Sequence, residues 1–439
     1  ISNCVSSVQI TEVAGVTSSS NYGGITGYGQ GLSNNIAYGV NISAINPAFY
    51  KAAIIGYSSA NDNTNNYYID CSLININNGT NSTATTGIGR GGNNTYSDVD
   101  GVQQVCKVTL ADEYVSVATE DPYITFNGTN YYKKWATFTL SHPDRVAQGY
   151  VFSNYSVTKD GTDPVQNVGV NESEGVFSFY MPDNHVTVKA VYNIQLTGQG
   201  TQQDPYIILD TNHLNYLATQ VNSRQNDYSG KHFKLDADIT YRHSTAWDNN
   251  NSTENNYTAI GYFYRAEDYR AFRGNLDGDN HTISGIRIHK NGVGGDDCNQ
   301  GIFGCIEGGT IKKIILTDCR YTGYKDVGGI AGKMIGGKVS NCHVLSNVVI
   351  YAVSGSASGH GGVVGACNHG AGGIVEYCSS SAKVISRVVN NGGSDFGGLV
   401  GSGGGYVRNN LVIGATVDSA RHWYGAISGS YENQGYYSN

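Results

Sequence analysis

Short apolar runs between glycines recur along this chain, and they predict strands. The segments GGIAG, GGVVG, GGLVG and YGAISG end at Gly332, Gly365, Gly401 and Gly429. Each of the first three leads through a loop to a second alternating segment, GGKVSNCHV, GGIVEYCSS or GGYVRNNLV. Val, Ile and Thr placed between small or polar residues and bounded by glycine are typical of short strands. The 3.6-residue apolar period of a helical repeat is not seen in these segments.

The spacing of these cassettes indicates a repeat protein. From Gly304 onward their closing glycines lie 28 to 36 residues apart, a period typical of solenoids, propellers or arrays. Strand-like segments with this period favour a β-solenoid. A more degenerate run at the start of the chain, GGITG and AAIIG, predicts a second solenoid. We expect the closing glycines to form sharp turns between strands: Gly27, Gly56, Gly304, Gly332, Gly365, Gly401 and Gly429.

The second segment of each repeat predicts a ladder of small residues that point inward. Equivalent residues of neighbouring coils in a β-solenoid lie about 4.8 Å apart. Free cysteine packs as a small hydrophobe, so a buried core position is favoured over a metal site. The same spacing is within reach of a disulfide, and the sequence does not decide whether one forms. The predicted ladder residues are Cys4, Asn35, Cys71 and Cys106 in the first run, and Cys319, Cys342, Cys378 and Asn410 in the second.

The cassettes resemble the GLUG motif, a glycine-rich repeat of bacterial secreted and surface proteins that include adhesin-like and giant repeat proteins. The resemblance covers about 204–429, including the lead-in segments GTQQDPYIIL, FKLDADI and FRGNLDGDNHTISGIRI. In such relatives the lead-in caps or opens the solenoid, and the family shares no set of catalytic residues. From the residues themselves, 214–221 reads as a short helix and 272–288 as a hairpin with its turn at Asp277 to Asn280.

Between the two runs the glycine cassettes stop, and Tyr, Phe, Lys and Val alternate. The segment VFSFYMPDNHVTVKAVY predicts strand, turn, strand, with the bend at Pro182 to Asn184. This part resembles an internalin-type B-repeat, a small β-grasp-like module of bacterial surface stalks. We therefore predict an all-β chain with two runs of Gly-rich β-solenoid (β-helix) separated by such a module. The predicted parts are 1–106, N-terminal solenoid; 107–193, B-repeat-like module; 194–300, lead-in or cap with one helix; and 301–439, C-terminal GLUG-type solenoid.

Composition and charge limit the classes of partner that we expect for this chain. The net charge is −8 and only 14% of residues are charged, with no basic cluster, so nucleic acid and anionic membrane surfaces are not expected partners. No apolar run approaches the roughly 18 residues of a membrane span. An odd number of cysteines, nine, excludes complete pairing within one chain. No cofactor is expected. Calcium is a weak alternative at the acidic groups Asp236, Asp238, Asp277 and Asp279.

Three classes of function remain. A structural or adhesive extracellular surface protein is favoured, with 59 glycines for short strands and 33 tyrosines for a rigid amphipathic surface. Both solenoid ends are expected to be open, so the chain would be one period of a tandem array or a subunit that stacks head to tail into a filament. Exposed loops would contact a host or matrix glycan or protein, with candidate residues Tyr321, Tyr324, Tyr351, His360 and His369.

The alternatives are a glycan-binding module without catalysis and, below it, a carbohydrate-active β-helix enzyme. Glycoside cleavage needs two carboxylates about 5 to 9.5 Å apart. The acidic residues of the repeats are expected at different registers, so no catalytic residue is assigned: Glu307, Asp318, Asp326, Glu376 and Asp395.

Overall fold

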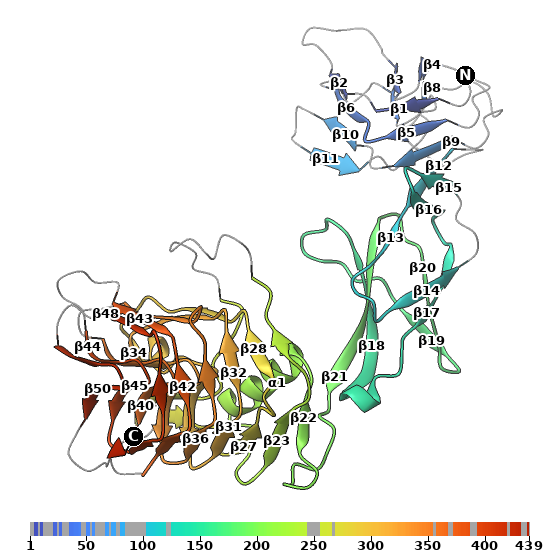
Figure 1. The fold of residues 1–439 in the computed structure, drawn as a ribbon. Coiled ribbons are helices and arrows are strands. Elements are labelled where there is room, and N and C mark those ends of the chain that lie inside the picture. Colours follow the sequence, from blue (N-terminus) through green and yellow to red (C-terminus); the bar gives the residue numbers. More distant parts are fainter. Residues whose placement is uncertain are drawn as a thin grey trace. The chain divides into compact units, whose positions relative to one another are not determined.

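Parallel pairing between strands of successive repeats builds most of this structure. The computed structural model describes residues 4–7, 9–11, 21–23, 26–28, 35–44, 50–52, 55–57, 66–69, 72–75, 80–83, 102–119, 124–243, 255–265, 268–353, 357–367, 372–386, 393–418, 422–431 and 437–438. Strands dominate these residues and they contain one α-helix, so the all-β prediction is confirmed (Figure 1). The chain forms two compact units, Ile1–Asp144 with Phe152–Asn193 and Arg145–Val151 with Ile194–Asn439.

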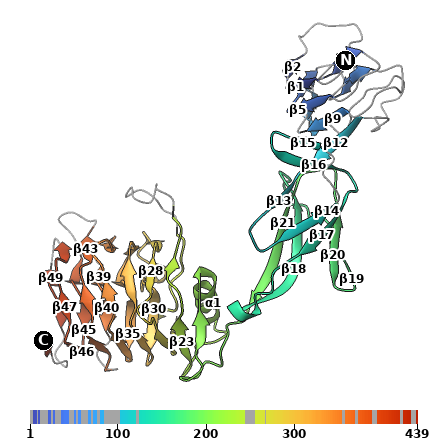
Figure 2. The ribbon, with the colours of Figure 1, turned by 45° about the vertical axis from the view of Figure 1, so that its right-hand side comes forward.

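The second unit consists mainly of five parallel ladders, which the chain visits in turn (Figure 2). The first ladder contains β22 (Tyr206–Ile208), β23 (His232–Leu235), β27 (Asn275–Asp277), β31 (Thr310–Lys312), β36 (Lys338–Ser340), β41 (Ile374–Glu376), β46 (Tyr406–Arg408) and β51 (Tyr437–Ser438). The second contains β24 (Ile239–Thr240), β28 (Thr282–Ser284), β32 (Ile315–Thr317), β37 (His343–Val344), β42 (Ser379–Ser380) and β47 (Leu411–Val412). The third contains β29 (Arg287–His289), β33 (Arg320–Gly323), β38 (Val349–Ala352), β43 (Lys383–Ser386) and β48 (Thr416–Asp418).

The last two ladders hold the glycine cassettes. The fourth contains β34 (Lys325–Gly328), β39 (Ser358–Gly361), β44 (Ser394–Gly397) and β49 (His422–Gly425). The fifth contains β30 (Phe303–Glu307), β35 (Ala331–Ile335), β40 (Val364–Cys367), β45 (Val400–Gly403) and β50 (Ser428–Tyr431). A short antiparallel pair, β25 (Tyr262–Arg265) and β26 (Asp268–Arg270), lies before the first cassette.

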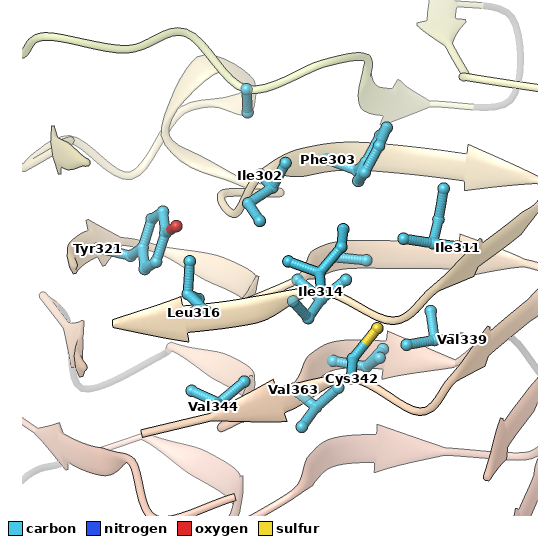
Figure 3. Close-up of a cluster of buried hydrophobic side chains, with 14 of the residues drawn as sticks. Ile302, Phe303, Ile311, Ile314, Leu316, Tyr321, Val339, Cys342, Val344 and Val363 are labelled. Atoms are coloured by element: carbon cyan, nitrogen blue, oxygen red, sulfur yellow. The ribbon is translucent and has the colours of Figure 1, made fainter. Parts of the chain in front are cut away.

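The interior of the second unit is filled by apolar side chains from successive coils. Figure 3 shows two pairs on opposite sides of the cluster, Ile311 with Val339 of the first ladder and Leu316 with Val344 of the second. All four are at most 1% exposed. The short helix α1 (Thr211–Asn222) contributes to this core through Leu214, Leu217 and Val221. Its first turn is fixed by Asp210, whose carboxylate accepts the backbone N–H groups of Asn212 and His213.

The predicted hairpin at 272–288 is wrong. The strands β27, β28 and β29 belong to three different ladders, and each pairs in parallel with strands of neighbouring coils. The turn residues Asp279 and Asn280 have positive φ values of 47° and 68° and form a corner of the coil. The turn chemistry was therefore identified correctly, whereas the partners of the strands were not.

The first unit begins with parallel ladders of the same kind. One contains β1 (Val5–Ser6), β5 (Ile36–Tyr38), β9 (Asn66–Ile69) and β12 (Val102–Cys106), and another β2 (Gln9–Thr11), β6 (Asn41–Ala44) and β10 (Ser72–Asn75). Shorter pairs are formed by β3 (Asn21–Gly23) with β7 (Tyr50–Ala52) and by β4 (Thr26–Tyr28) with β8 (Ile55–Tyr57). An antiparallel strand β11 (Thr80–Thr83) joins β10.

The rest of the first unit is a module of two sheets around one core. The sheets are β13-β21-β18 and β14-β17-β20-β19. Their strands are β13 (Val108–Leu110), β14 (Ser116–Thr119), β17 (Thr137–Ser141), β18 (Tyr150–Lys159), β19 (Asn171–Ser173), β20 (Val176–Tyr180) and β21 (Val186–Ile194). The hairpin β15 (Ile124–Phe126) and β16 (Thr129–Lys133) continues from β12. The predicted strands on either side of Pro182 are present, in different sheets; the likeness to a β-grasp module stays a prediction.

The closing glycines of the cassettes lie in strands, so their prediction as turn residues is wrong. Gly304, Gly332, Gly365, Gly401 and Gly429 share one register of the fifth ladder. The pairing of β4 with β8 places Gly27 opposite Gly56 in the same way. What requires glycine is the neighbouring backbone of the fourth ladder. A Cβ atom on Gly365 would lie 2.4 Å from the amide nitrogen of Val327, and one on Gly401 2.3 Å from that of His360.

We expect Gly365→Ala to lower the free energy of unfolding by about 2 kcal/mol or more, because the added methyl group forces two paired backbones apart. Gly403→Ala is the matched control in the same ladder, since a Cβ there meets nothing closer than 3.6 Å. Chemical denaturation of both variants measures the difference. Equal stability of the two variants would contradict the close-contact explanation.

Candidate functional site

An asparagine ladder runs through the first strands of the chain. The predicted ladder residues Cys4 and Asn35 share one register, and the next member is Asn66, which the sequence analysis missed. The Asn35 side chain accepts the backbone N–H of Cys4 at 2.9 Å, and that of Asn66 accepts the backbone N–H of Asn35 at 3.1 Å. Asn35 also donates its amide to Asn66 Oδ1 at 2.8 Å. These amides satisfy buried backbone groups at a corner of the coil.

One predicted member of that first ladder is misplaced, and another lies outside the described residues. Cys106 lies in β12, pairs with Tyr132 of β16 and is buried in the core of the two-sheet module, so its assignment to the ladder is wrong. Cys71 lies outside the described residues. The signal in the sequence is the equal step of 31 residues from Cys4 to Asn35 and from Asn35 to Asn66, not the recurrence of cysteine.

In the second unit the predicted ladder is correct at three of its four positions. Strand pairing aligns Cys342, Cys378 and Asn410, and Asn410 Oδ1 accepts the backbone N–H of Cys378 at 2.8 Å. The residue before Cys342 in this ladder is Ile314, whose side chain lies beside it in Figure 3. Cys319 instead aligns with Ile286 and Val348 at the start of the third ladder. Both thiols of Cys342 and Cys378 are buried, and burial raises the pKa of the Cys342 thiol.

The predicted ligand-contact residues do not form an exposed surface. Tyr321 and His360 are fully buried in strands β33 and β39, so their prediction as loop residues is wrong. Tyr324 is half-buried against the core, with Lys325 Nζ 5.0 Å from its ring, and Tyr351 lies in β38 with the Arg320 guanidinium 5.9 Å from its ring. These residues lie in or next to strands rather than in long loops, because every second residue of each strand fills the interior. His369 lies outside the described residues.

A ladder of left-handed residues borders the glycine cassettes. Asn299, Asp326, Gly359, Asp395 and Trp423 occupy one register of the fourth ladder and its lead-in. Their φ values lie between 51° and 72°, a region that Gly, Asn and Asp tolerate best. The sequence signal is an Asp two residues before the paired glycines, as in DVGG and DFGG. Asp326 and Asp395 therefore share a register, contrary to the expectation that the acidic residues fall at different ones.

The left-handed ladder contains a group of polar side chains that contact one another. Lys333 Nζ donates to Asp326 Oδ2 at 3.0 Å, and Asn299 Nδ2 donates to the same oxygen at 3.4 Å. The side chains of Lys333 and Asp326 are only 16% and 18% exposed. Desolvation raises the pKa of Asp326, and the nearby Lys333 acts against this shift. The Lys333 amine, the Asn299 carboxamide and the Asp326 carboxyl group are thus in contact at a site that is largely shielded from water.

The cavity beside the end of α1 carries balanced charges. It has a volume of 500 Å³ and is lined in part by Arg224, Arg270 and Arg273. Arg224 and Arg270 both contact Asp268, and Arg273 contacts Asp227 and Glu307 at 2.7 Å each. Every one of these guanidinium groups therefore has a carboxylate partner, which leaves the cavity without a strong preference for an anion.

The acidic groups considered for calcium contact basic side chains of the protein itself. Lys234 Nζ lies 3.0 Å from Asp279 and 3.5 Å from Asp236, and Lys312 Nζ lies 3.0 Å from Asp277. His281 contacts Asp238 at 3.1 Å. No group of three or more His, Cys, Asp or Glu side chains suited to a metal ion is found within the described ranges. In the same part of the chain, no helix is long and apolar enough to cross a membrane.

The last described coil leaves interior positions uncovered. Tyr321, Ile350 and Val384 form one inward line of the third ladder, and all are fully buried. The next member, Val417, is only partly buried. The line from Val327 through His360 and Phe396 ends likewise at Tyr424, which is 63% exposed. Val412 and Ile427 complete this end face, which we define as Val412, Val417, Tyr424 and Ile427.

Comparison with known proteins gives one related sequence. No protein-family model matches the chain. Halomucin of Haloquadratum walsbyi (strain DSM 16790 / HBSQ001) is 28% identical over 234 residues, which are 52% of this chain and 2% of that protein. The chain therefore spans only a small part of the length of this relative.

A solved structure named as a candidate immunoglobulin A1 protease from Bacteroides ovatus superposes with a TM-score of 0.37 and 18% identity. The match covers 55% of this chain and 66% of that one. A likeness this low carries no conclusion on the fold or the activity.

His360 should make the protein less stable in mild acid. Its side chain is buried between Val327 and Phe396, and desolvation lowers its pKa from 6.5 to about 4. Below pH 6.5 the unfolded chain binds a proton that the folded chain does not, so stability falls as the pH decreases toward 4. By pH 5 this contribution is about 2 kcal/mol relative to pH 7.

Urea denaturation at pH 7 and pH 5 measures this loss. We expect His360→Leu to remove that part of the pH dependence, whereas His343→Leu, at a half-buried position of β37, should keep it. An unchanged pH dependence in His360→Leu would show that the folded protein accommodates the imidazolium ion.

Proposed function

We propose that this chain is a structural or adhesive protein of the cell surface, located outside the cell, which forms a segment of a shaft or filament and presents loops for adhesion. The similarity to Halomucin supports a surface protein. The repeated short strands support an elongated structural element rather than a site for a small substrate.

We further propose that the parallel ladders are coils of a GLUG-type, Gly-rich β-solenoid, and that the first unit starts with a second run of such coils. Five ladders visited in a fixed order, each with members from successive repeats, support this proposal. The cassette glycines pair in the same way in both units, Gly27 with Gly56 and Gly332 with Gly365, and this also supports the proposal. The two-sheet module in the first unit would be the internalin-type B-repeat of a surface stalk.

The observation that carries the head-to-tail proposal is the uncovered end face. Its four residues continue lines of side chains that are fully or almost fully buried in the coils below. A further coil of the same kind would cover them and would pair with the open edges of β47, β48, β49 and β50. In a second copy, β1 supplies such an edge, since β5 is its one strand neighbour among the described residues, and its first residue, Val5, is 60% exposed.

We propose that the chain is not an enzyme. Asp326 and Asp395, the acidic pair that shares a register, are separated by Gly359 and therefore by two ladder steps, about 9.6 Å. This backbone spacing lies at the upper end of the range of about 5 to 9.5 Å between carboxylates in glycoside cleavage, so what the two carboxylates contact decides. Asp326 contacts Lys333, and Asp395 accepts a hydrogen bond from Ser394 at 3.0 Å. Both carboxylates are thus held by neighbouring side chains of the protein.

A glycan-binding module remains the second candidate. A cavity of 610 Å³ beside α1 is lined by residues that include Asn222 and Asn256, and the amides of these two side chains bond to the backbone. Asn222 donates to Ala259 O and accepts from the Gly261 N–H, and Asn256 donates to Gly285 O. A binding surface would therefore use the exposed aromatic residues Tyr377 and Tyr406, which are 53% and 41% exposed, rather than the buried Tyr321.

Sedimentation velocity over a range of concentrations tests the head-to-tail proposal. We expect species larger than the 46.8 kDa chain, growing with concentration. Tyr424→Lys should abolish them, because it places a charge at the centre of an apolar contact. Tyr377→Lys is the matched control, since this exposed tyrosine lies at a corner on the side of the stack.

A single species of monomer mass at every concentration would refute the proposal. Association that survives Tyr424→Lys but is lost in Tyr377→Lys would move the contact to the side of the stack. Circular dichroism of both variants verifies that each is folded.

A further inference from the structure

The polar group formed by Asn299, Asp326 and Lys333 contains the three side-chain groups that formation of an amide needs. These are a carboxamide, a carboxyl group and an amine. The polar group joins two successive coils, since Asn299 precedes β30, Asp326 lies in β34 and Lys333 lies in β35. Asn299 is 2% exposed, and its backbone N–H donates to Lys325 O at 2.8 Å, which fixes it beside the next coil. The aromatic ring of Phe263 lies 4.7 Å from Lys333 Nζ and shields the amine from water on that side.

The polar atoms needed for transfer of an acyl group each have a hydrogen-bond partner in place. The backbone N–H of Phe263 donates to Asn299 Oδ1 at 2.8 Å, which polarises the carboxamide and would stabilise negative charge on that oxygen. Asp326 Oδ2 accepts hydrogen bonds from both nitrogens, Lys333 Nζ and Asn299 Nδ2. One carboxyl group therefore contacts both the attacking amine and the group that would leave.

We propose that Lys333 and Asn299 form an intramolecular isopeptide bond that covalently connects two successive coils. In the reaction Asp326 takes a proton from Lys333 Nζ, and the neutral amine attacks Asn299 Cγ. The Cγ–Nδ2 bond then breaks while Asp326 gives that proton to the leaving nitrogen, and ammonia departs. Asp326 then takes the second proton that Nζ loses as the amide forms, so it ends protonated and neutral. The new Nζ–Cγ bond replaces the lost one, so no oxidant, reductant or cofactor is required.

The surroundings favour this reaction over a simple ion pair. Burial of the carboxyl group raises the pKa of Asp326, which makes Asp326 a better acceptor for the proton that the reaction moves. If Asp326 were the acyl donor instead, no second carboxyl group is recorded in contact with Lys333 within the described residues to carry the proton. Asn299 as donor leaves Asp326 free for that role.

Mass spectrometry of the denatured full chain tests the proposal. We expect a mass about 17 Da below that of the sequence, since ammonia is lost. Proteolysis should yield a branched peptide in which Lys333 is joined to Asn299. The variants Lys333→Arg, Asn299→Ala and Asp326→Ala should each have the full sequence mass. Lys325→Arg, which changes a neighbouring lysine that contacts Tyr324, should keep the loss.

Three results would overturn the proposal. The first is a wild-type chain of unchanged mass, which decides the question even if a variant fails to fold. The second is a loss that persists in Lys333→Arg, because cyclisation of another asparagine also releases ammonia. The third is a loss of about 18 Da with Lys333 joined to Asp326, which would make Asp326 the acyl donor.

Discussion

The close contact between two backbones at the glycine cassettes is the constraint on which the second unit depends. The fourth and fifth ladders approach so closely that a Cβ atom on Gly332, Gly365, Gly401 or Gly429 would lie within 2.6 Å of backbone atoms of a neighbouring segment. Only glycine permits this distance, and the same position must recur in each coil for the strands to stay in register. The sequence therefore repeats about every thirty residues because each coil makes this backbone contact once.

Corners of the coils depend on residues that tolerate a left-handed backbone. Asn280, Lys313, Asn341, Tyr377 and Asn409 all have positive φ values where the chain passes from the first ladder to the second. Asparagine and aspartate dominate such positions because their side chains can bond to local backbone groups. The amides of Asn35, Asn66 and Asn410 bond to the backbone of the neighbouring coil instead. Each accepts a hydrogen bond from a backbone N–H of the preceding coil. These asparagines thus have a structural role at the corners.

Alternating apolar residues and recurrent glycines were sufficient to predict an all-β chain and most strands of the repeats. The helix expected at 214–221 is found as Thr211–Asn222. Local signals could not show which strands pair, so 272–288 was interpreted as a hairpin although its strands belong to three ladders. Cys319 was misplaced because residue identity was given more weight than distance from the paired glycines. Counted from Gly309 and Gly337, the equivalent residues are Ile314 and Cys342.

The site was harder to predict than the fold. Tyr321 and His360 look like loop residues in the sequence, since burial of a polar aromatic residue is decided by which side of a short strand it occupies. The contacts among Asn299, Asp326 and Lys333 depend on pairing between coils, and no local pattern reveals them. The acidic residue two positions before the paired glycines is the one signal that could have directed attention there.

Cryo-electron microscopy of the purified chain at high concentration tests the central claim most directly, namely that the end face receives another coil of the same kind. We expect rods in which the strand spacing of about 4.8 Å continues without interruption across the contact made by Val417 and Tyr424. Separate particles in which these two side chains face solvent would contradict it.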